Sequence, residues 1–137
     1  MATETTGTED TALIDSVRVT RTLPQPLNDV WAALMTPEGV VALLGEGGEL
    51  GNKGDGWQAT DGTYGVTRTF HPMEQIRFSW HADADAPATL VDLHMRAGDD
   101  NGTVLELVHE NLPEDADREA LTQRWDTALT RIAEQAN

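Results

Sequence analysis

The sequence lacks cysteine entirely and has almost no lysine. No Cys occurs among the 137 residues, which excludes disulfide bonds and metal sites with thiolate ligands. Lys53 is the single lysine, and Asp and Glu number 24 against 9 Lys and Arg, so the net charge is -15. A surface of this charge repels nucleic-acid backbones and anionic membranes, so we expect neither as a partner.

Long apolar runs, a signal-like start and the common catalytic motifs are also missing. We therefore expect a cytoplasmic protein that does not enter a membrane. Neither G-x-S-x-G nor H-E-x-x-H occurs, and the glycine-rich stretch Gly45–Gly56 lacks the Gly-Lys-Ser/Thr of a phosphate loop. The sequence therefore predicts no catalytic set, no cofactor and no nucleotide site.

The remaining composition is that of one folded domain. Apolar residues make up 39% and charged residues 24% of a chain long enough for a single core. Residues 1–14 are rich in Thr and acidic residues without apolar periodicity, which predicts a flexible tail. We expect the domain to span residues 15–137.

Alternating apolar and polar residues predict about six strands. They are joined by short turns, so we expect an antiparallel sheet with one apolar and one polar face. The predicted strands are Ser16–Leu23, Trp57–Thr60, Tyr64–Phe70, Gln75–His81, Thr89–Arg96 and Thr103–Glu110.

Helical periodicity appears in two places. Leu27–Thr36 and a segment from Pro37 to about Leu44 predict two short helices between the first two strands. Leu112–Ala136 predicts one long helix, with Pro113 at its start and Glu114, Asp115 and Asp117 in the first turn. Its apolar stripe comprises Leu121, Trp125, Ala128, Leu129, Ile132 and Ala136. The fold class is therefore α+β, with this helix covering the apolar face of the sheet.

Local motifs in this order resemble one known family. Val30-Trp31-Ala32-Ala33-Leu34 precedes Thr36-Pro37-Glu38-Gly39, Phe70-His71-Pro72 precedes Ile76-Arg77-Phe78-Ser79-Trp80, and Gly102-Thr103 begins a strand that leads to Asn111-Leu112-Pro113 and then to Trp125. The chain resembles bacterial homologues of the C-terminal domain of the activator of heat-shock protein 90 ATPase. These belong to the START/Bet v 1-like (SRPBCC) superfamily, so the resemblance implies a helix-grip fold, a curved sheet wrapped around the C-terminal helix.

The resemblance implies a cavity for a small hydrophobic ligand, such as a lipid, polyketide or aromatic compound. Two other functions stay open: a stress-response module that binds a chaperone, and a cyclase/aromatase or hydrolase on the same scaffold. We expect a monomer or homodimer. Eleven inward residues are predicted to line the cavity: Trp31, Met35, Trp57, Tyr64, Phe78, Trp80, Met95, Leu107, His109, Trp125 and Leu129.

Each of these residues also has a plainer interpretation. The aromatic residues are equally compatible with an ordinary core. His109 shares a strand face with Leu105 and Leu107, so it points inward, as a ligand anchor, a proton donor or, as we favour, a structural histidine with a hydrogen-bond partner. His94 should face water beside Asp92, and we predict no metal site.

Overall fold

The computed structural model describes residues 16–114 and 116–136. The predicted tail, residues 1–14, lies outside the described residues, as does Asp115. The elements in chain order are β1 (Val17–Leu23), α2 (Leu27–Leu34), α3 (Pro37–Leu44), β2 (Gly56–Gln58), β3 (Tyr64–His71), β4 (Gln75–Trp80), β5 (Thr89–Ala97), the 3-10 turn η1 (Asp99–Asn101), β6 (Thr103–Glu110) and α4 (Arg118–Gln135).

The strands form one antiparallel sheet of six in the order β1-β6-β5-β4-β3-β2. Every other pair of neighbours joins strands that are consecutive in the chain, whereas β1 and β6 are its first and last strands. These two pair from Val17 opposite His109 to Leu23 opposite Thr103. The two short helices carry the chain from β1 at one edge to β2 at the other. The predicted α+β helix-grip fold is confirmed.

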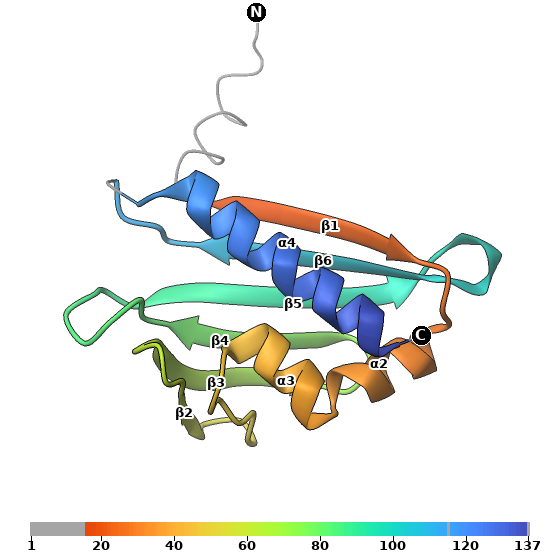
Figure 1. Ribbon diagram of the computed structural model, residues 1–137, viewed down its shortest axis with the longest axis horizontal. Coiled ribbons are helices and arrows are strands. Elements are labelled where there is room, and N and C mark those ends of the chain that lie inside the picture. The colour runs from red at the N-terminus through yellow and green to blue at the C-terminus, as the bar shows by residue number, and fades with distance from the viewer. Residues whose placement is uncertain (1–15, 115, 137) are drawn as a thin grey trace, which may run out of the picture.

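All three helices lie on one face of the sheet, with α4 crossing it diagonally and α2 and α3 beside α4 (Figure 1). The alternation along each strand turns one set of side chains toward these helices, as predicted. In β6, for example, Leu105, Leu107 and His109 are all fully buried. From α4, Trp125, Leu129 and Ile132 are also fully buried against this face.

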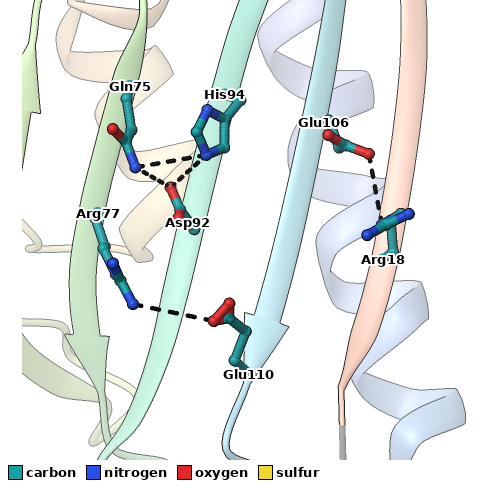
Figure 2. A network of polar contacts seen from close by, with 7 residues as sticks. All are labelled: Arg18, Gln75, Arg77, Asp92, His94, Glu106 and Glu110. Carbon is teal, nitrogen blue, oxygen red and sulfur yellow. Dashed lines mark hydrogen bonds and ion pairs between the residues drawn. The ribbon is translucent and has the colours of Figure 1, made fainter. Parts of the chain in front are cut away.

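The other face of the sheet is polar. Figure 2 shows two ion pairs on this face: Arg18–Glu106 links the neighbouring strands β1 and β6, and Arg77–Glu110 reaches from β4 across β5 to β6. The Asp92 carboxylate lies 3.1 Å from His94 Nε2 and accepts a hydrogen bond from the Gln75 amide. The prediction that His94 faces outward beside Asp92 is confirmed.

The start of the long helix differs from the prediction. Helix α4 begins at Arg118, so Pro113 and Glu114 lie outside it. Asp117 is the N-cap, and its carboxylate accepts a hydrogen bond from the Ala120 N–H at 3.0 Å. The sequence offers two possible starts, and the capping side chain marks the real one because it satisfies a free backbone donor of the first turn.

Several strand ends also differ from the predictions by one or two residues, among them those of β2 and β4. Strand β2 is shorter than predicted because the chain turns after it, with Ala59 N–H bonded to Thr63 O. Strand β4 ends at Trp80, and His81 forms only an isolated bridge with Tyr64. Among residues 16–114 and 116–136, no helix is long and apolar enough to span a membrane.

Candidate ligand-binding site

A pocket of about 260 Å³ opens at the end of the sheet where α4 begins. The β4–β5 loop and the connection from β6 to α4 leave the sheet at this same end, because β4 and β6 run in the same direction (Figure 1). The residues that line the pocket are Trp80, Ala82, Ala86, Pro87, Thr89, Leu112, Pro113, Ala116, Asp117, Ala120 and Leu121.

Most of these side chains are small or rigid. Four are alanines and two are prolines, and they come from both connections and the first turn of α4. Leu112 is buried and fixes the β6–α4 connection to the core. The chain therefore closes over this end of the sheet without side chains large enough to fill it.

The inner wall of the pocket is Trp80, at the end of β4. Its ring packs edge-on against His109, with centroids 5.0 Å apart, and against Trp125 at 5.9 Å. His109 and Trp125 are fully buried behind it. This aromatic cluster separates the pocket from the filled core.

A chain of hydrogen bonds runs through the cluster. The Trp125 indole N–H donates to His109 Nδ1 at 3.0 Å, and an indole nitrogen can only donate. Neutral His109 therefore carries its hydrogen on Nε2, which donates to Thr89 Oγ1 at 2.7 Å. Thr89 in turn donates to Trp80 O at 2.7 Å, so both ring nitrogens of His109 are satisfied.

His109 is neutral at physiological pH. Burial, and secondarily the nearby Arg124 charge, lower its pKa from 6.5 to about 4. Protonation would also place an N–H at Nδ1, facing the Trp125 donor. These contacts match the structural histidine that we favoured from the sequence, and they leave its predicted roles as ligand anchor or proton donor as predictions.

Arg124 closes the cluster from the helix side. Its guanidinium lies 5.3 Å from the Trp80 ring centroid and 5.4 Å from that of Trp125. It also pairs with Asp61 in the β2–β3 turn at 3.5 Å. Partial burial raises the pKa of Asp61, but hydrogen bonds from Thr63 and the Arg124 charge outweigh it, so that pKa lies below its usual value.

The residues predicted to line one cavity are divided among the pocket at α4, two open hollows and the core. Trp80 is the member of the set that lines the pocket at α4, as far as the described residues show. Tyr64 and Trp57 border an open hollow beside β2, and Met35 borders another next to α3. The others belong to the core or pack against its edge: Trp31, Phe78, Met95, Leu107, His109, Trp125 and Leu129.

Neither hollow resembles a metal centre. Among the described residues, no group of three or more His, Asp or Glu side chains is placed to hold a metal ion.

His81 stacks on Tyr64 with ring centroids 4.3 Å apart, and its Nδ1 lies 3.0 Å from Ala86 O. This contact holds the β4–β5 loop against the sheet beside the pocket.

The sequence model of the family described as Activator of Hsp90 ATPase homolog 1-like protein matches residues 24–137. The chain belongs to this family. No curated protein matches it significantly in sequence.

Solved structures share the fold of this family domain. CalU16 from Micromonospora echinospora is 22% identical with a TM-score of 0.73, over 89% of this chain and 76% of that one. DynU16, encoded in the dynemicin biosynthetic locus, is 22% identical with a TM-score of 0.71. The match covers 88% of this chain but only 46% of DynU16. The Aha1 dimer from Colwellia psychrerythraea is 16% identical with a TM-score of 0.68, over 87% of this chain and 93% of that one.

Most residues that line the pocket in this family domain were not predicted from the sequence. Six of these ten residues lie in the segments 82–87 and 112–116, and five of the six are Ala or Pro. The antiparallel strand order places the two segments at one end of the sheet. Their shared composition, combined with that topology, is the signal that would have found them.

Proposed function

We propose that this domain binds a small apolar molecule in the pocket at the start of α4. The observation that carries the proposal is an apolar pocket of about 260 Å³ beside a core of buried side chains. Ligand sites are mostly apolar concavities with few polar groups, and this pocket has that character. The ligand would lie between the sheet and the C-terminal helix, as expected from the sequence, but at the first turn of the helix.

The pocket volume limits the ligand to about one or two rings. Drug-sized ligands occupy sites of roughly 300–1,000 Å³, and an apolar cavity of about 150 Å³ holds benzene. A pocket of about 260 Å³ lies between these cases. A long lipid chain or a four-ring polyketide would extend beyond it into solvent.

Ala86 offers a direct way to block the pocket. It lines the wall from the β4–β5 loop, whereas Ala88, two residues further, is exposed and is not part of the wall. Ala86→Phe should fill the pocket and abolish binding of naphthalene-sized probes, measured by isothermal titration calorimetry. Ala88→Phe adds the same ring to the same loop and should bind like the wild type.

Native mass spectrometry of the freshly purified protein provides an independent test. We expect the wild type to retain a small molecule that Ala86→Phe loses. Equal probe binding by both phenylalanine variants would contradict the proposal, as would the absence of any probe binding to the wild type.

Chaperone docking is a second candidate function, favoured by the description of the family as a homologue of an Hsp90 ATPase activator. With a net charge of -15, a complex of this kind should weaken as salt is raised. A pull-down with the host chaperone at two salt concentrations tests it. Ala86→Phe distinguishes the two functions, because it should remove ligand binding and leave docking intact.

A further inference from the structure

The side chains that line the pocket include two hydrogen-bond acceptors and, among the described residues, no cation. The lining residues that the structure describes include no Lys, Arg or His. Their polar side chains are Thr89, Asp117 and the Trp80 indole, whose Nε1 is buried and has no hydrogen-bond partner. A ligand in the pocket therefore meets a mostly apolar wall, including the Trp80 ring, with two oxygen-bearing side chains.

Four backbone N–H groups around the pocket already have hydrogen-bond partners. The N–H groups of Ala86 and Ala116 bond to Asp83 O and Pro113 O. In the first turn of α4, Ala120 N–H bonds to the Asp117 carboxylate and Leu121 N–H to Asp117 O. The prolines in the wall have no N–H at all.

Acceptor capacity remains at both oxygen-bearing side chains. Thr89 Oγ1 gives its hydrogen to Trp80 O and receives one from His109, which leaves one lone pair. The Asp117 carboxylate uses one oxygen to cap α4, and its second oxygen has further lone pairs. Two side chains of the lining therefore keep acceptor capacity.

The same groups oppose an anion. A helix start normally favours negative charge, but here the Asp117 carboxylate already occupies that position. The nearby cation, Arg124, lies outside the lining residues and is engaged by Asp61 and two indole rings. The net charge of -15 adds a long-range repulsion to any acidic ligand.

Resting on the proposed function, we propose that the ligand is an apolar ring compound that carries a hydrogen-bond donor, a hydroxyl or amino group, and no acidic group. The donor satisfies an acceptor in the wall, while a carboxylate would enter a site whose described lining includes no Lys, Arg or His side chain and already carries the Asp117 carboxylate. Selectivity of this kind separates phenols and arylamines from aryl acids of the same size.

Three probes of nearly equal shape test this selectivity by calorimetry at neutral pH. They are 2-naphthol, 2-methylnaphthalene and 2-naphthoate. We expect 2-naphthol to bind about three- to tenfold more tightly than 2-methylnaphthalene, the range for one neutral hydrogen bond. We expect 2-naphthoate to bind at least about tenfold more weakly than 2-methylnaphthalene, because its charge would be buried unpaired.

Asp117→Asn supplies the residue-level test. Asparagine still caps a helix, so α4 should keep its start while the pocket loses its negative charge. The affinity of 2-naphthoate relative to that of 2-methylnaphthalene should rise several-fold. Asp126→Asn removes the same charge at an exposed position of the same helix, outside this pocket. It should leave the relative affinity of 2-naphthoate unchanged.

The outcomes separate this inference from the proposed function. If the three probes bind equally, if 2-naphthoate binds most tightly, or if the two asparagine variants behave alike, the selectivity is wrong while a ligand pocket remains. If no probe binds and Ala86→Phe changes nothing, the proposed function itself fails.

Discussion

The two halves of α4 meet the sheet in different ways. In the C-terminal half, Trp125, Leu129 and Ile132 are fully buried among strand side chains. In the N-terminal half, Ala120 is exposed and Leu121 is half-buried, and both border the pocket. One helix therefore covers a filled core at one end and an open site at the other.

The difference follows from side-chain volume and from the point at which the helix begins. Large aromatic and branched residues from both layers interlock in the core, as close packing requires. At the other end the facing segments carry Ala and Pro. The N-cap at Asp117 also makes α4 begin only after the connection from β6 has crossed the end of the sheet. The cluster of Trp80, His109 and Trp125 marks the boundary between them.

A pair of identical substitutions tests this contrast most strongly. Leu129→Ala should lower the free energy of unfolding by about 2–5 kcal/mol, because it leaves a cavity in a filled core. Leu121→Ala should cost only about 1 kcal/mol, since its side chain already borders open space. Urea denaturation of both variants measures the difference, and equal losses would mean that the two ends are packed alike.

The boundary cluster predicts a dependence of stability on pH. The pKa of His109 is about 4 in the folded protein and near 6.5 when unfolded. Below pH 6.5 the unfolded chain binds a proton that the folded chain does not, so the free energy of unfolding falls as pH falls. The loss due to His109 should reach roughly 3 kcal/mol by about pH 4 and vanish above pH 7.

The control is a histidine outside the core. Subtracting the pH profile of His109→Gln from that of the wild type isolates this contribution. His71→Gln makes the same substitution at an exposed position of β3 and serves as the matched control. A His109→Gln profile parallel to the wild type would show that His109 is not buried in its neutral form.

The smallest expected effect concerns the helix start at the pocket rim. Asp117→Ala removes the cap on Ala120 N–H and should destabilise the protein by about 1 kcal/mol. Asp117→Asn should retain most of that stability, because asparagine also caps. Thermal unfolding compares the two, and equal destabilisation would mean that the cap is not what fixes the start of α4.

Much of the fold is predictable from the sequence because alternation and helical periodicity are local. Thr103–Glu110 was predicted with its observed bounds, and α3 ends at Leu44 as expected. The start of α4 was wrong because Pro113 with its acidic neighbours resembles a first turn as closely as Arg118 with the Asp117 cap does. Only the contacts of Leu112 and Ala120 distinguish them.

The candidate site was less accessible to sequence reasoning. Periodicity correctly predicted that Trp80 and His109 face the helices and that Trp125 faces the sheet. It carries no information on whether a space between the two layers is filled. That depends on volumes contributed by segments far apart in the chain, here residues 82–87 and 112–116. A pocket made by small residues in loops has no periodic signal of its own.

Backbone amide shifts during a titration with 2-naphthol test the central claim most directly. The account predicts shifts confined to the pocket end, at Trp80, Ala86 and Ala116, with Leu107 and Leu129 unchanged. Shifts centred on Leu107 and Leu129, or no shifts at all, would contradict the claim that this domain holds its ligand at the open end of a filled core.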